Sequence, residues 1–181
     1  MSVPDHDLTE TLREAQRFGF FGPGSIEDAV DHASAFEAPL RGQTSTDPLA
    51  DLGSGGGLPG LELAAAFPDT PMTFIDRRTK RTDFLRRAVR RHGFDHVDVV
   101  ADDVDHVISE VMAGERPGFT AVTARGFGPP EATLRAAAAL MTPDGRIVIS
   151  EPPSGDRWAP RLLDELSLVR VQHDRVVVFR H

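Results

Sequence analysis

The stretch DLGSGGGLPGLELAAAFPDTPMTFID, residues 51–76, decides the fold of this chain. It has four glycines within the five positions 53–57, continues with Leu-Pro-Gly, and ends on an aspartate after an apolar run. Glycines at such density let the backbone turn tightly and approach another group closely. Three kinds of group could lie against this loop: the phosphates of a dinucleotide, a different adenosine cofactor, or only neighbouring protein backbone.

Around this stretch, short apolar segments alternate with helical ones from Pro48 onward. The predicted strands are residues 48–52, 71–76, 97–101, 119–124 and 145–150, and the predicted helices are about 59–67, 79–92, 104–113 and 130–141. Apolar runs bounded by Pro, Gly and Asp are typical of buried parallel strands. Alternation of this kind predicts a doubly wound parallel sheet.

The two ends of the chain differ from this middle part. Residues 157–166 predict a helix, and 167–172 and 175–180 predict a hairpin across His173 and Asp174. We therefore expect a Rossmann-like α/β fold with seven strands, mostly parallel, closed by an antiparallel C-terminal hairpin. This is the arrangement of class I S-adenosylmethionine (SAM) methyltransferases, whereas dinucleotide-binding Rossmann domains normally lack the hairpin.

The predicted domain organisation is one methyltransferase domain over residues 1–181. Residues 1–40 form a short helical N-terminal extension, and residues 48–181 form the SAM-binding core. The segment 18–24, FGFFGPG, separates two N-terminal helices, and the polar segment 41–47 links them to the core.

Composition excludes several classes of protein. The chain has 181 residues and no cysteine, which excludes disulfides, thiolate metal sites and thiol nucleophiles. Its seven histidines show no metal-ligand spacing, so we expect no metal. The polar N-terminus is unlike a signal peptide and no apolar run approaches the roughly 20 residues of a membrane span, so we expect a cytoplasmic protein without a membrane partner. No long apolar surface helix stands out, which favours a monomer.

The acids that flank the glycines favour SAM over a dinucleotide. Asp51 precedes the loop as Asp-x-Gly-x-Gly-x-Gly, where an acid can answer the ammonium group of methionine but would repel a pyrophosphate. Asp76 ends the next strand, where an acid accepts hydrogen bonds from ribose hydroxyls in NAD and SAM sites alike. The match to Gly-x-Gly-x-x-Gly at 55–60 is weak evidence by itself. The alternative is a turn whose glycines serve packing only.

Positive charge is concentrated in one segment of an acidic chain. The net charge is −8, yet eight of the 20 Lys and Arg residues lie between Arg77 and Arg91. One interpretation is an RNA-backbone contact, because neutralising phosphates supplies affinity. The other is a solvated helix face whose arginine stems cover apolar surface. We favour the RNA contact for the residues directly after the strand that Asp76 ends: Arg77, Arg78, Lys80 and Arg81.

Three motifs resemble the bacterial 16S rRNA guanine-N7 methyltransferase family, called RsmG or GidB. They are DLGSGGGLPGLELA, FIDRRTKRTDFLRR and VTARGF, and the resemblance covers about residues 48–150. The Leu-Pro-Gly continuation is more specific than the glycines. The resemblance implies a Rossmann-like methyltransferase fold, SAM as methyl donor, and 16S rRNA or the small ribosomal subunit as partner.

The resemblance also assigns site residues one at a time. Gly53 and Leu58 match cofactor-lining loop positions, within a loop whose Ser54, Gly55 and Gly57 we also assign to the cofactor. Val104 and Asp105 match the pair that ends the third strand and flanks the adenine, where the family usually has Glu in place of Asp105. Arg125 matches an arginine beside the cofactor that faces the substrate. It is the predicted catalytic residue.

The chain departs from the family at substrate-facing positions. The family's His-x-x-Asp-Ser appears here only as HASAF at 32–36, and the lysine after the fifth strand is replaced by Ser150-Glu151-Pro152-Pro153. Asp103 stands where an arginine is common. These departures lie outside the cofactor core, so they bear on the substrate and not on SAM.

The resemblance implies methyl transfer to guanine N7, which already carries a lone pair. We therefore expect no general base, and catalysis by orientation with Arg125 seating the base or a neighbouring phosphate. Since A-form RNA hides this edge, the target should be an unpaired loop. Two alternatives stay open: a SAM methyltransferase acting on a small molecule, and a catalytically degenerate nucleotide-binding module.

Overall fold

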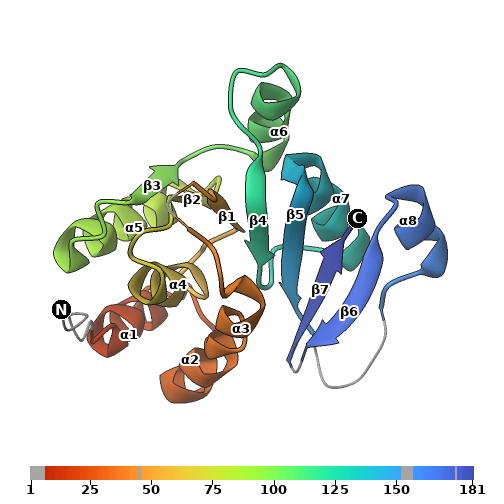
Figure 1. Cartoon of the computed structure of the whole chain (residues 1–181). Helices are drawn as coiled ribbons and strands as arrows, with labels where there is room; N and C mark the ends of the chain where they lie inside the picture. Colours follow the sequence, from red (N-terminus) through yellow and green to blue (C-terminus); the bar gives the residue numbers. More distant parts are fainter. Residues whose placement is uncertain (1–6, 45, 152–156, 174) are drawn as a thin grey trace.

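The computed structural model describes residues 7–44, 46–151, 157–173 and 175–181, and the strands within them form one seven-stranded sheet in the order β3-β2-β1-β4-β5-β7-β6 (Figure 1). Strands β1 to β5 pair in parallel, β7 runs antiparallel to β5, and β6 runs antiparallel to β7. The mostly parallel sheet with an antiparallel C-terminal hairpin is therefore confirmed. The strands are β1 (Leu49–Leu52), β2 (Met72–Ile75), β3 (Val97–Val100), β4 (Phe119–Ala124), β5 (Met141–Ser150), β6 (Val169–His173) and β7 (Val176–Arg180).

Helices cover both faces of this sheet. Alternating side chains along each strand build two apolar layers, since successive residues point to opposite faces. Leu49 and Phe74 belong to the layer that also holds α1 to α5, whereas Ala50 and Ile75 belong to the layer that holds α6 to α8. The helices are α1 (Thr9–Arg17), α2 (Ile26–Ser34), α3 (Glu37–Leu40), α4 (Gly60–Ala66), α5 (Thr79–His92), α6 (Val104–Met112), α7 (Pro130–Leu140) and α8 (Pro160–Glu165).

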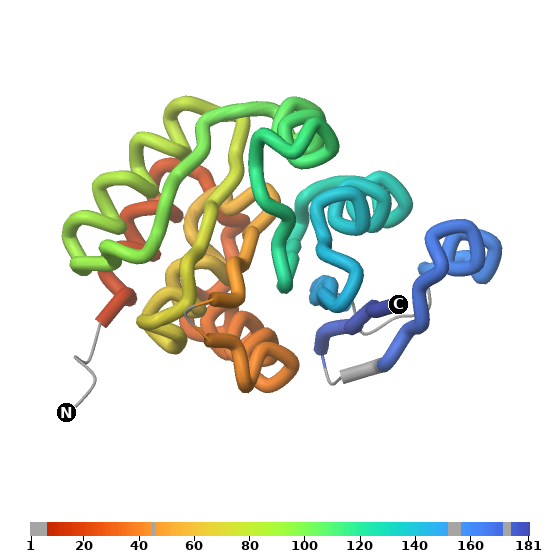
Figure 2. Tube along the Cα trace, turned by 45° about the horizontal axis from the view of Figure 1, so that its top comes forward, coloured from red at the N-terminus to blue at the C-terminus, as the bar shows by residue number. Residues whose placement is uncertain are grey.

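The N-terminal helices pack against the core. Leu12, Phe36 and Leu40 are fully buried in the same apolar layer as Leu49 and Phe74. In Figure 2 the N-terminal trace lies against the segments that carry α4 and α5. This packing places the segment between α1 and α2, which holds the aromatic residues of FGFFGPG, beside the glycine-rich loop.

Polar contacts fix the same arrangement. The hydroxyl of Ser25 accepts the N–H of Asp28 and caps the start of α2. The Arg91 guanidinium donates to Glu14 of α1 at 3.0 Å, and Arg146 of β5 donates to the carbonyl of Pro39 at 2.8 Å. At the start of α1 the Asp7 carboxylate accepts the N–H of Thr9 at 3.0 Å.

Several boundaries differ from the prediction, most clearly those of β5, α8 and β6. Strand β5 begins at Met141 and not at Gly145, and its register against β4 shifts between Phe119 and Ala121. Helix α8 covers only Pro160–Glu165 of the predicted 157–166, and His173 lies in β6 and not in the turn. Hydrogen bonding to neighbouring strands extends a strand past its apolar run, which no local pattern reports. Among the described residues, no helix is long and apolar enough to cross a membrane.

Candidate active site

The glycine-rich loop connects β1 to α4 and is held at the carboxyl end of β2. The N–H groups of Gly53 and Ser54 both donate to the carbonyl oxygen of Ile75, at 2.8 and 3.2 Å. Gly53 has φ +66° and Gly57 has φ +105°, which only glycine adopts without strain. The loop is therefore turned back over the strand end where Asp76 follows.

Two aromatic rings lie directly on this loop. A Cβ at Gly53 would stand 2.7 Å from the Phe127 ring, and a Cβ at Gly56 would stand 2.5 Å from the Phe21 ring. Phe127 comes from the segment after β4, and Phe21 comes from the segment between α1 and α2. The loop glycines thus permit close packing by protein groups as well as the approach of a ligand.

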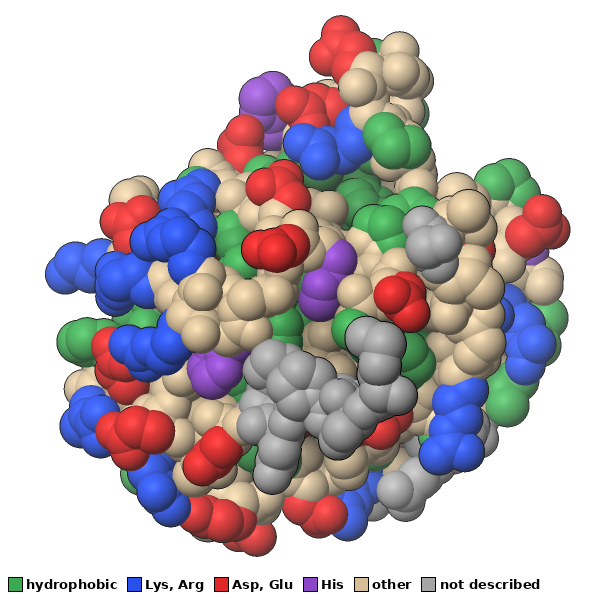
Figure 3. All heavy atoms as spheres, turned by 60° about the vertical axis from the view of Figure 1, so that its left-hand side comes forward, with side chains coloured by type: hydrophobic (Ala, Val, Ile, Leu, Met, Phe, Trp, Pro, Cys, Tyr) green, Lys and Arg blue, Asp and Glu red, His purple; other side chains and the backbone are tan. Residues whose placement is uncertain are grey.

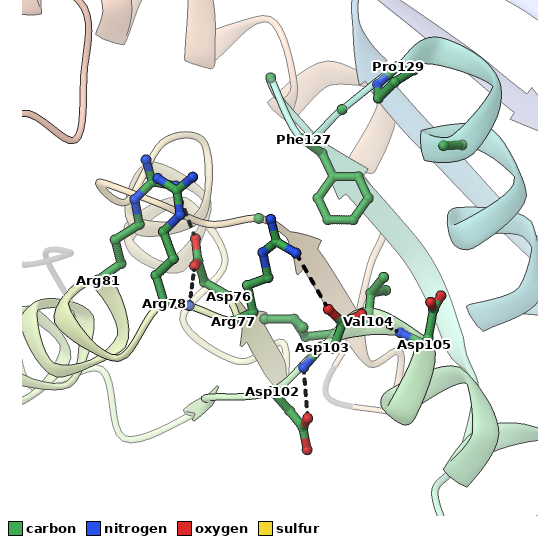
Figure 4. A pocket seen from close by; sticks show the side chains of 15 residues that line it. Asp76, Arg77, Arg78, Arg81, Asp102, Asp103, Val104, Asp105, Phe127 and Pro129 are labelled. Carbon is green, nitrogen blue, oxygen red and sulfur yellow. Dashed lines mark hydrogen bonds and ion pairs between the residues drawn. The ribbon is translucent and has the colours of Figure 1, made fainter.

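The Asp76 carboxylate contacts the glycine-rich loop and two arginines of the segment after β2. The Asp76 side chain is nearly buried, with Oδ2 accepting the N–H of Gly55 at 3.1 Å and Oδ1 accepting the N–H of Arg78 at 2.9 Å. The Arg81 guanidinium lies 3.5 Å from Oδ2 (Figure 4). The carboxylate therefore links the glycine loop, the end of β2 and the start of α5.

A cleft of about 360 Å³ opens beside Asp76. We call it the Asp76 cleft; it lies at the carboxyl ends of β1 to β4, where ligands bind in open α/β sheets. Figure 4 shows Phe127 on one side of it and the start of α6 on the other. Its lining residues are Gly53, Ile75, Asp76, Arg77, Arg78, Arg81, Asp102, Asp103, Val104, Asp105, Gly126, Phe127, Gly128, Pro129 and Ala132.

Two further hollows continue from this cleft. The glycine-loop pocket, about 230 Å³, shares Gly53, Arg81 and Gly126 with the Asp76 cleft. Its lining residues are Phe20, Phe21, Gly22, Gly53, Ser54, Gly55, Gly56, Leu58, Arg81, Arg125 and Gly126. The α2 pocket, about 350 Å³, shares Phe21, Gly22 and Arg125 with the glycine-loop pocket and is otherwise walled by α2 and the residues before it. The three hollows form one continuous row.

Arg125 stands where the glycine-loop pocket meets the α2 pocket. It follows the last residue of β4, and its Nη1 donates to the carbonyl of Ala29 in α2 at 3.0 Å. Burial lowers the pKa of the Arg125 guanidinium from its ordinary value, and the charge of Asp51 opposes that effect. The guanidinium is therefore bonded to α2 and belongs to the lining of both hollows.

Asp51 lies beneath the loop and lines none of these three hollows. Its position in β1 points it to the same face as Phe74 and Thr123, and the Thr123 hydroxyl donates to Oδ1 at 2.8 Å. This placement differs from the direct ammonium contact predicted from the sequence. Burial raises the pKa of the Asp51 carboxyl to about 6, against the effect of the Thr123 hydrogen bond.

This pKa predicts how stability depends on pH. Folding raises the pKa of the Asp51 carboxyl from 3.8 to about 6, so the folded protein holds this proton more tightly than the unfolded chain does. The stability that the proton contributes is present below pH 3.8 and is lost as the pH rises through about 6. The difference corresponds to about 3 kcal/mol. We expect the free energy of unfolding of the wild type, minus that of Asp51→Asn, to rise by up to about 3 kcal/mol between pH 7 and pH 4.

Urea unfolding of both proteins across this pH range measures that difference. The subtraction removes the exposed carboxylates, such as Glu10 and Glu27, whose pKa values are lowered and which act in the opposite direction. A difference that stays flat with pH would contradict the burial of an ionisable Asp51.

The structure brings together eight of the ten residues assigned to the cofactor. Gly53, Ser54, Gly55, Leu58, Asp76, Val104, Asp105 and Arg125 line the Asp76 cleft or the glycine-loop pocket. Gly57, like Asp51, lines neither, because it packs against Leu61. Val104 and Asp105 do not end the third strand as predicted: β3 ends at Val100, and they open α6, which Asp103 caps.

Sequence reasoning assigns no aromatic residue to the site, although the Phe127 ring could stack on a base as well as pack at the rim. Phe127 and the neighbouring Gly126, Gly128 and Pro129 line the Asp76 cleft from the segment after β4. Their position after a parallel strand is a signal that could have found them. Phe20 and Phe21 carry no such signal, since only the packing of the N-terminal helices brings them to the loop.

The basic segment divides into three kinds of residue. Arg77, Arg78 and Arg81 line the Asp76 cleft, whereas Lys80 does not. Arg86 donates to the carbonyl of Val99 and Arg91 to Glu14, so both serve the fold. The other basic residues, Lys80, Arg87 and Arg90, are exposed and make no ion pair with the described residues. Figure 3 shows Lys and Arg side chains gathered on one part of the surface.

The donor set of the site suits an adenosine cofactor and offers no metal cage. The described residues contain no group of three or more His, Asp or Glu placed to hold a metal ion. The loop glycines form a cradle that side chains would fill, and the nearly buried Asp76 stands at its floor. A carboxylate beside a cleft with an aromatic wall fits a ribose and a planar base.

Several named proteins are similar in sequence to this chain, over 58% to 91% of its length. The protein named ribosomal RNA small subunit methyltransferase G from Novosphingobium aromaticivorans is 36% identical to this chain, over 80% of this chain and 61% of that protein. The protein of the same name from Marinobacter nauticus is 35% identical, over 58% of this chain and 46% of that protein. One from Bifidobacterium longum is 27% identical over 91% of this chain and 77% of that protein. The chain thus spans about half to three quarters of these relatives.

Solved structures share the fold at low identity. The T. thermophilus 16S rRNA methyltransferase RsmC superposes with a TM-score of 0.67 at 18% identity, covering 89% of this chain and 44% of that one. An O-methyltransferase from Bacillus cereus gives 0.65 at 12% identity, covering 95% and 88%. The fold is therefore the Rossmann-like fold of class I methyltransferases. The sequence model of GidB, described as rRNA small subunit methyltransferase G, matches residues 27–152, more than half of the chain, so the chain belongs to this family.

Proposed function

We propose that this protein is a SAM-dependent methyltransferase that transfers a methyl group to guanine N7 in the 16S rRNA of the small ribosomal subunit. The observation that carries the proposal is the row of hollows at the carboxyl ends of the strands, with Asp76 at one end and Arg125 at the other. Membership of the GidB family supports the substrate.

The residues that line the two hollows suit the ribose, the adenine and the methionine part of SAM, one after another along the row. Asp76 would accept hydrogen bonds from the ribose hydroxyls, and Val104, Asp105 and Phe127 would enclose the adenine in the Asp76 cleft. The methionine part would then occupy the glycine-loop pocket, against Gly53 and Leu58. Together the two hollows, about 360 and 230 Å³, suit a ligand of that size.

SAM, when bound, supplies an electrophilic methyl group on a sulfonium. The chain's part is to place the accepting nitrogen in line with it, and N7 of guanine already presents a lone pair. Asp28 and His32 line the adjoining α2 pocket, whereas the described residues around the glycine-loop pocket, where the methyl group would lie, include no carboxylate or imidazole to act as a base. That lining fits a reaction in which no proton has to be removed first.

The α2 pocket is the proposed entrance for the base. It meets the glycine-loop pocket at Phe21 and Arg125, and Arg125 is fixed by its bond to Ala29. The exposed cations Lys80, Arg87 and Arg90 would contact phosphates of the same RNA. In the segment after β5 that lacks the family's lysine, Pro152 and Pro153 lie outside the described residues, and the Glu151 carboxylate accepts the indole N–H of Trp158 and pairs with Arg157, so it serves the local structure.

The test is transfer of labelled methyl from SAM to small ribosomal subunits taken from a strain that lacks this protein. We expect label in 16S rRNA as N7-methylguanosine, and a loss of about 100-fold in rate for Arg125→Ala with SAM affinity changed much less. The control is Arg161→Ala, on the opposite layer of the sheet. Full activity of Arg125→Ala would show that its assigned role is wrong.

Salt dependence separates RNA from a small-molecule substrate. Phosphate contacts predict a steep fall in activity between about 50 and 200 mM salt. Activity on a small molecule would be indifferent to salt, and SAM binding without any transfer would identify a degenerate module. The proposed substrate places the protein in the cytoplasm, where we expect it to act as a monomer.

A further inference from the structure

All charged side chains among the described residues that line the glycine-loop pocket are positive. Among the described residues around it, Arg81 and Arg125 are charged and both are cationic, while the others are glycine, serine, leucine and phenylalanine. The nearby carboxylates do not face this pocket: Asp51 is fully buried beneath the loop, and Asp76 opens to the neighbouring cleft. The two cationic side chains can therefore pair with an anionic group of a ligand bound in this pocket.

The two arginines are not equivalent. Arg125 is bonded to the Ala29 carbonyl and shares its position with the α2 pocket, on the side away from Asp76. Arg81 lines the glycine-loop pocket and the Asp76 cleft but not the α2 pocket. Arg81 thus stands at the junction between the two parts of the proposed cofactor site.

The contacts of Arg81 leave its guanidinium available. Its Nη1 lies 3.5 Å from Asp76 Oδ2, at the outer limit of a hydrogen bond, and the side chain is 24% exposed. The guanidinium lies over the Phe20 ring, with Cζ 5.8 Å from the ring centroid. Its Nη1 lies 3.7 Å from the place that a Cβ on Gly55 would occupy. Phe20 and the glycine loop therefore hold the guanidinium at the pocket rim.

We infer that Arg81 binds the carboxylate of the amino-acid part of SAM, an inference that rests on the proposed function. A guanidinium matches a carboxylate with two parallel hydrogen bonds, which is stronger than its present long contact to Asp76. When Arg81 turns to this carboxylate, Asp76 Oδ2 keeps the hydrogen bond from the Gly55 N–H and can accept a second one from a ribose hydroxyl. Arg81 is then a cofactor residue and not one of the RNA contacts predicted from the sequence.

Decarboxylated SAM, which lacks only that carboxylate, tests the assignment by binding alone. Calorimetry on the full chain gives the ratio of the dissociation constants of decarboxylated SAM and SAM. We expect a ratio of about ten or more for the wild type. In Arg81→Met we expect a ratio near one, because SAM weakens while decarboxylated SAM does not; Arg81→Lys should retain an intermediate ratio.

Controls make each outcome decisive. Arg161→Met removes the same charge from an exposed position of α8, away from the three hollows, and its ratio should equal that of the wild type. A wild-type ratio near one, or an unchanged ratio in Arg81→Met, overturns the role of Arg81 and leaves the proposed function standing. A wild type that binds neither ligand overturns the proposed function itself. If thermal melts show Arg81→Met unfolded, Arg81→Gln takes its place under the same criterion.

Discussion

Replacing Asp76 with alanine is expected to weaken SAM binding by about 100-fold or more. The carboxylate accepts the N–H groups of Gly55 and Arg78, and it is the proposed acceptor for ribose hydroxyls. Hydrogen bonds to a charged group contribute about 1.5–3 kcal/mol each, and two of them account for a change of this size. Calorimetric titration with SAM measures it directly.

The matched control is Asp95→Ala, which removes an exposed aspartate outside the site. It should bind SAM as the wild type does. Circular dichroism melts of both variants separate a lost ligand contact from a lost loop structure. Binding of SAM to folded Asp76→Ala within threefold of the wild type would show that Asp76 does not hold the ribose.

Replacing Gly60 with alanine is expected to destabilise the protein by about 3 kcal/mol, the upper part of the range for overpacking a core. The new Cβ would stand 2.8 Å from Asp51 Oδ2 and 2.8 Å from a Phe74 ring carbon. Both neighbours are fully buried, and Thr123 holds the Asp51 carboxylate, so neither side chain moves easily. For a chain of this length the melting temperature should fall by roughly 6–12 °C.

Gly24→Ala is the control for this prediction. Nothing lies within 4 Å of a Cβ at Gly24, so its melting temperature should change by no more than roughly 2 °C. Calorimetric melts of both variants at the same pH make the comparison. An equal effect of the two substitutions would mean that α4 does not pack against Asp51 and Phe74 as described.

Local patterns predict most of this architecture. Apolar runs such as VDVV and FTAVTA, bounded by polar residues, indicate buried strands, and their alternation with helices before a hairpin predicts the mostly parallel seven-stranded sheet that the structure has. The boundaries of β5 and α8 were not predictable, because pairing with neighbouring strands and packing decide where an element ends. The arginines of α5 show the same limit: spacing alone does not separate Arg86 and Arg91, which serve the fold, from Arg87 and Arg90.

The sequence by itself determined the strand-loop-helix unit, the acid after the second strand and the family of the chain. These follow from glycine conformations and apolar periodicity, which act over a few residues. Tertiary structure alone decided that Asp51 lies beneath the loop while Asp76 lines the cleft, and that Phe21 reaches Gly56 across the fold. The physical reason is that strand register and helix packing set which face each side chain meets, and those contacts join residues far apart in the chain.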